Sequence, residues 1–239
     1  MTRSSQASTA AMLSTTENLR TAVTNSLQDI SNDWGSDIDV FKNVPWGKAM
    51  MWIFLVSDTF IFTCFLTSYM TVRISTTVPW PIPSEVFALT IAGHHIPLIL
   101  IAIMTFILIT SSGTMAMAVN FGYRRDRGKT AILMIITGMF GATFVGMQAF
   151  EWTKLIVEEG VRPWANPMGA AQFGSTFFMV TGFHGLHVSV GVIYLSIVAW
   201  KVWRGHYEQT KYEIVEIAGL YWHFVDLVWV FIFAFFYLW

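Results

Sequence analysis

Apolar positions fall into five long runs along the chain, and the polar positions gather between them. The runs together hold 119 residues, half of the chain, but only two of its 29 formal charges, Asp58 and Asp226. A bilayer core of about 30 Å takes roughly 20 helical residues, so each run is long enough to cross it. The pattern predicts an all-α membrane bundle with five transmembrane helices. The predicted spans are Ala49–Val72, Ile96–Val119, Ala131–Phe150, Phe173–Trp200 and Ile217–Trp239.

A polar N-terminal region, residues 1–45, precedes the transmembrane domain, which we place at residues 46–239. Ser14 and Glu17 match a capping box, in which two side chains satisfy backbone N–H groups at a helix start. Apolar residues then recur at helical spacing from Leu19 to Ile30. Two interpretations stay open: a short amphipathic helix on the membrane or a partner, and a partly disordered leader.

Composition narrows the class of protein further. Charged residues make up 12% of the chain, against about 25% in soluble domains. The single cysteine, Cys64, excludes a disulfide within the chain, and a net charge of −1 gives no case for nucleic-acid binding. Lys and Arg favour the cytoplasmic side of a membrane. With the N-terminus inside, eleven of them lie in inner segments and three in outer ones, so we expect a cytoplasmic N-terminus and an outer C-terminus.

Asp58 is the first candidate for chemistry, because it lies about 14 Å into its span at 1.5 Å per residue. An unpaired charge at that depth costs several kcal/mol, so such residues usually face the bundle interior and often serve proton or ion pathways. Two interpretations stay open: a role in proton uptake, and a neutral acid that hydrogen-bonds a neighbouring helix.

Two pairs at i, i+3 spacing, His184 with His187 and His223 with Asp226, each share one helical face. Facing haem ligands need matched depth, but His184 lies about 24 Å from the inner end of its span and His223 about 9 Å. We therefore expect all four to be structural, hydrogen-bonding residues and expect no metal ligand among them. Haem ligation stays as the alternative.

Two further groups lie near the predicted span ends. Glu151 follows Gln148 at the outer end of the third span, where we expect an ordinary interface residue with a structural, hydrogen-bonding role. The basic cluster Arg124, Arg125 and Arg127 is most simply a determinant of topology. A second interpretation is a headgroup site for anionic lipid, since basic groups beside spans bind phosphates.

Two polar strings inside the spans resemble subunit III of the haem-copper oxygen reductases, the cytochrome c oxidase subunit III family. They are residues 181–188 (TGFHGLHV) and residues 221–229 (YWHFVDLVW). The resemblance covers about residues 46–239. Supporting matches are Ser57-Asp58, Thr110-Ser111-Ser112, and Gln148 with Glu151-Trp152.

The resemblance implies a non-catalytic subunit of a proton-pumping terminal oxidase, a respiratory complex that passes electrons from cytochrome c to O₂. In this family the haems and copper reside in subunits I and II, so the resemblance implies no cofactor in this chain. It also implies packing mainly on subunit I, a cleft that holds phospholipid, and support of proton uptake. The chain looks like the short, five-helix bacterial form, which implies the cytoplasmic (inner) membrane of a bacterium.

Other functions stay open. The family often has Glu after Ser where Asp58 stands here, and Asp also appears in quinol-oxidase relatives, so the electron donor is not settled. The chain could be subunit III of a quinol oxidase or an accessory subunit of a nitric-oxide reductase. A haem-bearing, quinone-reactive membrane anchor is an alternative of another class. The absence of an internal repeat disfavours a small secondary transporter.

Overall fold

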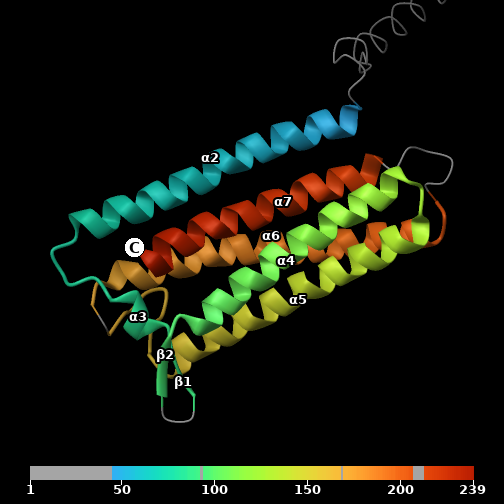
Figure 1. The fold of residues 1–239 in the computed structure, drawn as a ribbon. Helices are drawn as coiled ribbons and strands as arrows, with labels where there is room; N and C mark the ends of the chain where they lie inside the picture. The colour runs from blue at the N-terminus through green and yellow to red at the C-terminus, as the bar shows by residue number, and fades with distance from the viewer. Residues whose placement is uncertain (1–44, 92–93, 168, 207–212) are drawn as a thin grey trace, which may run out of the picture. The chain divides into compact units, whose positions relative to one another are not determined.

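The computed structural model describes residues 45–91, 94–167, 169–206 and 213–239 (Figure 1). These residues contain five helices that are long and apolar enough to cross a membrane. The prediction of an all-α bundle with five transmembrane helices is therefore confirmed. The predicted N-terminal capping box and the apolar residues from Leu19 to Ile30 lie outside the described residues. The helices are α2 (Trp46–Ser75), α4 (Ile99–Tyr123), α5 (Arg127–Val157), α6 (Ala171–Trp203) and α7 (Glu213–Phe233), and α7 continues as a π-helical turn, η1 (Ala234–Leu238).

The segment between α2 and α4 also contains regular structure. It holds the one-turn helix α3 (Pro83–Val86) and an antiparallel hairpin of β1 (Ala88–Ile91) and β2 (His94–Pro97). The predicted start of the second span at Ile96 is wrong, because Ile96 pairs with Leu89 in the hairpin. Leu98 then adopts a φ of 59°, which a right-handed helix does not accommodate, so α4 begins one residue later.

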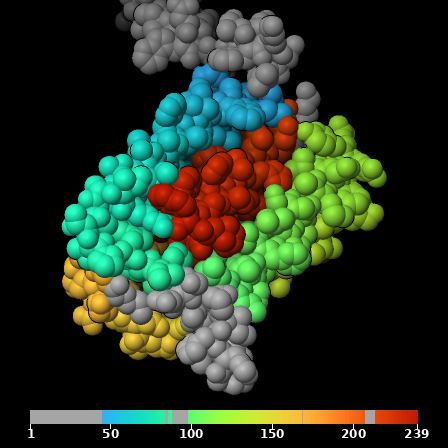
Figure 2. Space-filling model, turned by 60° about the vertical axis from the view of Figure 1, so that its left-hand side comes forward, coloured from blue at the N-terminus to red at the C-terminus, as the bar shows by residue number. Residues whose placement is uncertain are grey.

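Four helices form the packed core of the described transmembrane unit. Helix α4 packs on α5 and α7, and α6 packs on the same two helices. Helix α2 runs beside α6 and α7 and turns a narrow stripe toward them, with Leu55, Asp58, Phe62 and Tyr69 as its buried residues. Figure 2 shows α7, in red, lying at the surface between α2 and α4.

Glycines permit the closest helix contacts. A Cβ on Gly141 of α5 would overlap the ring of Trp222, and one on Gly191 of α6 would lie 3.0 Å from that ring. Gly182 of α6 also lies in a close contact, because a Cβ there would lie 3.1 Å from the ring of Trp152. A Cβ on Gly185 would meet no atom of the described residues within 4 Å.

Candidate functional site

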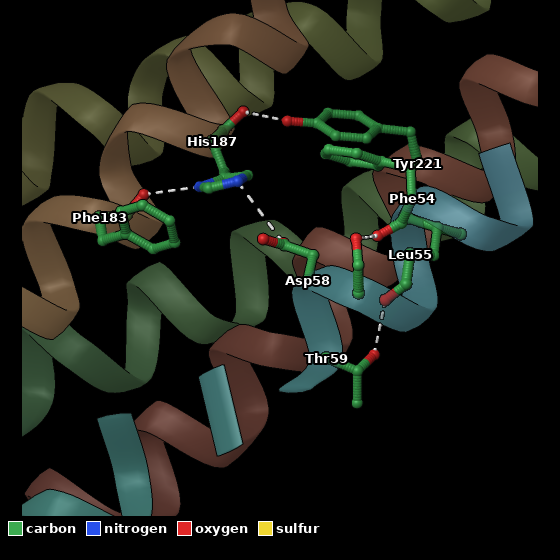
Figure 3. A network of polar contacts seen from close by, with 8 residues as sticks. Phe54, Leu55, Asp58, Thr59, Phe183, His187 and Tyr221 are labelled. Atoms are coloured by element: carbon green, nitrogen blue, oxygen red, sulfur yellow. Dashed lines mark hydrogen bonds and ion pairs between the residues drawn. The ribbon is translucent and has the colours of Figure 1, made fainter. Parts of the chain in front are cut away.

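Asp58 of α2 and His187 of α6 face each other across the bundle (Figure 3). Only 3% of the Asp58 surface is exposed. The Nε2 atom of His187 lies 3.5 Å from Oδ2 of Asp58, within ion-pair range, although this oxygen has no hydrogen bond from any residue that the structure describes. The burial shows that Asp58 faces the bundle interior, as an acid at this depth should.

A backbone contact sets the proton arrangement of His187. Its Nδ1 atom lies 2.8 Å from the carbonyl oxygen of Phe183, one turn earlier on α6. Because a carbonyl oxygen only accepts, Nδ1 carries the hydrogen, and Nε2 of a neutral ring is then the acceptor. A neutral ring and a charged carboxylate would therefore face each other with two acceptors. One proton between Asp58 and His187 removes this conflict. If Asp58 holds it, a neutral acid faces a neutral ring; if Nε2 of His187 holds it, the two side chains form an ion pair.

Tyr221 ties α7 to this pair. Its hydroxyl donates to the carbonyl oxygen of His187 at 3.0 Å, and its ring lies 6.3 Å from that of Phe54 on α2 (Figure 3). Tyr221 therefore joins α7 to the helices that carry the two titratable groups.

Two apolar grooves border α2. The first has a volume of about 460 Å³, and its lining residues come from α2, α6 and α7: Met51, Phe54, Leu186, His187, Val190, Tyr194 and Tyr221. The second has a volume of about 340 Å³ and lies between α2 and α7, with Met70, Phe231 and Phe235 among its lining residues. His187 thus forms part of the wall of the first groove, with Asp58 behind it.

His184 does not make the hydrogen bond that we expected. Its side chain is buried, and neither ring nitrogen has a hydrogen-bond partner among the described residues. The ring instead stacks on Trp229 of α7, with 5.3 Å between centroids, and meets the edge of Phe144 of α5 at 5.9 Å. Aromatic packing thus holds α5, α6 and α7 together at this point.

His223 and Asp226 share one face of α7, but no hydrogen bond joins them in the described structure. Nδ1 of His223 lies 2.6 Å from the Ser112 hydroxyl of α4. Asp226 is buried, and within the described ranges neither carboxyl oxygen has a well-aligned hydrogen bond, although Ser112 lies beside it. The partner comes from the neighbouring helix, which the sequence spacing within α7 does not reveal.

Hydroxyl groups of α4 form a seam with α7 that sequence reasoning missed. The indole N–H of Trp222 donates to Ser111 at 2.9 Å, and that of Trp229 donates to Thr105 at 3.0 Å. Ser and Thr inside apolar spans commonly hydrogen-bond across helices, and this was the available signal.

Glu151 is buried among the described residues, with 3% of its surface exposed. Helix α5 continues to Val157, and η1 packs against the turn that carries Glu151. The Gln148 amide donates to Oε2 of Glu151 at 2.7 Å, and the Tyr237 hydroxyl donates to the same oxygen at 3.2 Å. The expected hydrogen-bonding character of this residue is thus present, within the bundle.

The comparisons with known proteins identify the family. A sequence model described as "Cytochrome c oxidase subunit III" matches residues 3–239, nearly the whole chain. The chain belongs to the cytochrome c oxidase subunit III family. It is also 31% identical over 187 residues to the "Probable quinol oxidase subunit 3" of Staphylococcus saprophyticus, covering 78% of this chain and 86% of that relative. The proteins of the same description from Staphylococcus aureus strains USA300 and NCTC 8325 match equally well.

Family membership makes the chain subunit III of a haem-copper respiratory oxidase, a multi-subunit membrane complex. The two strings that carried the resemblance lie in α6 and α7. The first contains His187, which faces Asp58, and the second begins with Tyr221, which donates to the His187 carbonyl. The family signature therefore surrounds the Asp58–His187 pair. In the described part of the chain, no three His, Cys, Asp or Glu side chains gather closely enough to hold a metal ion.

The basic cluster of the subunit lies at the turn between α4 and α5. Arg124, Arg125 and Arg127 are all exposed there. Asp126 caps α5, because its carboxylate accepts from the Lys129 backbone N–H at 3.2 Å. This hydrogen bond, together with the Lys129 ammonium 3.2 Å from the other oxygen, lowers the pKa of Asp126. The lipid-headgroup role of the three arginines stays a prediction.

Proposed function

We propose that this chain is a non-catalytic subunit III of a proton-pumping terminal oxidase in the cytoplasmic membrane of a bacterium, where it supports proton uptake by the complex. The Asp58–His187 pair is the observation that carries this proposal. Haem and copper reside in partner subunits I and II, and this chain holds no redox centre. Its N-terminus is cytoplasmic, in keeping with the excess of Lys and Arg in the inner segments.

The geometry of the pair supports a role in proton handling. The Phe183 carbonyl fixes the hydrogen on Nδ1 of His187, so Nε2 is the atom that exchanges a proton with Asp58. A proton can occupy either partner without movement of the backbone. His187 forms part of the groove wall, and the side chain of His187 is 14% exposed, so the pair is not sealed from the groove.

The two grooves beside α2 support the proposal that the subunit binds phospholipid. Their walls are largely apolar, which suits acyl chains. Arg124, Arg125 and Arg127 are suited to anionic headgroups at the cytoplasmic side. Subunit I is the main protein contact of the subunit, and subunit II lies in the same complex.

The proposed electron donor is cytochrome c, as in the oxidases that give the family its name. Quinol is the second candidate, because the similar Staphylococcus proteins are described as probable quinol oxidase subunits. Oxygen consumption by the purified complex with reduced cytochrome c, and separately with a quinol, decides between them.

Replacing Asp58 tests the proton role. Asp58→Asn keeps the size and shape of the side chain but cannot release a proton, so we expect an assembled complex of normal haem content whose proton-uptake rate falls several-fold. Asp58→Glu retains the acid and should preserve most of the rate. The measurement is turnover, and its decay during catalysis, from about pH 6 to 9. A rate and decay of Asp58→Asn equal to those of the wild type at every pH would refute the proton role.

A further inference from the structure

The π-helical turn η1 contacts two helices through consecutive residues. Phe236 packs on Tyr69 of α2, with 4.0 Å between ring centroids. Tyr237 packs on Phe87 at 4.5 Å and donates to Glu151 of α5. Both side chains are buried, and π-helical turns are frequent at functional sites. The turn therefore links α5 to the Ser75 end of α2.

A second contact fastens the same end of α2. Arg73 donates to the main-chain oxygen of Trp239 at 2.6 Å, and its guanidinium carbon lies 4.2 Å from the centre of the Trp239 ring. Because Trp239 follows η1 directly, any movement of η1 would also move this contact. The groove between α2 and α7 lies beside it, with Met70 and Phe235 in its wall.

Glu151 is the buried titratable group that holds η1. Its Oε2 atom accepts from Gln148 and Tyr237. Its Oε1 atom and the side-chain oxygen of Gln148 are buried without a hydrogen-bond partner in the part of the chain that the structure describes. The aromatic neighbours of Tyr237 from other elements include Phe87 and Phe177, which carry no charge. Lys154, one turn on along α5, is the cation that faces Glu151, and the Tyr237 phenol is ordinarily neutral below about pH 10.

The charge on Glu151 should therefore decide how well η1 docks. A neutral carboxyl group accepts both hydrogen bonds through Oε2 and brings no charge into the aromatic layer. A carboxylate strengthens these two bonds, but it buries a charge whose second oxygen has no donor, and such burial is costly. Opening of η1 would let water reach that oxygen.

We propose that Gln148, Glu151 and Tyr237 form a proton-sensitive latch. A proton on Glu151 keeps η1 docked and, through Phe236 and Trp239, keeps the Ser75 end of α2 closed against α7. Loss of that proton releases η1 and widens the groove between α2 and α7. The latch is independent of the electron donor and of the proton role of Asp58, so either proposal can fail without the other.

Hydrogen exchange in the intact complex tests the latch. Peptides that cover residues 66–75 and 231–239 are followed from about pH 5 to 9, with the intrinsic pH dependence of exchange removed. We expect the corrected exchange of both peptides to rise with pH in the wild type. In Glu151→Gln, which keeps an acceptor oxygen but cannot ionise, we expect slow exchange at every pH. Glu158→Gln, at an exposed acid beyond the end of α5, should behave as the wild type does.

Tyr237→Phe provides a second variant that does not alter the buried acid. Loss of its hydrogen bond should speed exchange of residues 231–239 about fivefold even at low pH, the equivalent of about 1 kcal/mol. A pH dependence that persists in Glu151→Gln would overturn the latch. Exchange of residues 66–75 that does not follow that of residues 231–239 would overturn the coupling to α2. A Tyr237→Phe profile identical to the wild type would also overturn the proposal.

Discussion

Trp222 lies fully buried between α5 and α6, with its indole N–H bound to Ser111 of α4. A Cβ on Gly141 would overlap this ring and would lie 2.7 Å from Val192. Trp222 is fully buried, so its ring cannot move aside easily. We expect Gly141→Ala to destabilise the subunit by about 1–3 kcal/mol, the usual cost of overpacking a core. Thermal unfolding of the complex in detergent measures the effect.

Gly146 supplies the matched control, because it lies on the same helix and a Cβ there would meet no atom within 4 Å. Gly146→Ala should leave the unfolding temperature unchanged or raise it, since Ala favours a helix by about 1 kcal/mol over Gly. Equal unfolding temperatures for the two variants would contradict the packing described at Trp222.

At the candidate site, the sequence predicted some features of individual residues but not their partners. Depth alone predicted that Asp58 faces the bundle interior, because a carboxylate in hydrocarbon needs a polar neighbour. The pairing with His187 could not be predicted, since the partner lies three spans later and the spacing of His184 and His187 does not reveal which ring faces α2. The stacking of His184 on Trp229 and the contact of Glu151 with η1 could not be predicted, because both are tertiary features.

At the scale of elements, the start of α5 depends on a titratable cap. Hydrogen bonding to Lys129 lowers the pKa of Asp126, so the carboxylate stabilises the folded helix start above the unfolded pKa of about 3.9. This stabilisation is lost as the pH falls through the lower pKa that Asp126 has in the folded state. We expect faster hydrogen exchange in residues 124–134 on acidification, after correction for the pH dependence of the intrinsic exchange rate. Asp126→Asn, which can still cap the helix, should abolish that acid dependence.

The same acid response in wild type and Asp126→Asn would show that another group controls the helix start. Lys129→Met separates the two contributions to the cap. It removes the ammonium but keeps the backbone N–H that donates to Asp126, so most of the acid dependence should persist.

The elements themselves were largely predictable, because hydropathy and length define a transmembrane helix almost without tertiary information. All five helices coincide with apolar runs in the sequence. The hairpin of β1 and β2 was missed because its residues, such as Ile96, continue an apolar run in sequence although their backbone pairs with another strand. The turn η1 was missed for a similar reason, since a π-helical turn has no distinct hydropathy pattern.

At the scale of the whole described molecule, polar contacts join α2 to the four-helix core near both of its ends and near its middle. Lys48 binds Glu216 of α7 at 2.7 Å, Asp58 faces His187, and Arg73 binds the Trp239 oxygen. Between these contacts lie the grooves proposed to hold lipid. On this account the subunit supplies a proton-exchanging pair and lipid-binding surfaces to a complex whose redox chemistry lies in its partners.

The most direct test of this account is an optical redox spectrum with metal analysis, recorded on the complex that co-purifies with this chain and on the chain after separation. We predict haem and copper in the complex and neither in the separated chain. Haem that stays with the separated chain, and is lost on replacing His184 or His223, would contradict the account. It would assign the redox centre to this subunit.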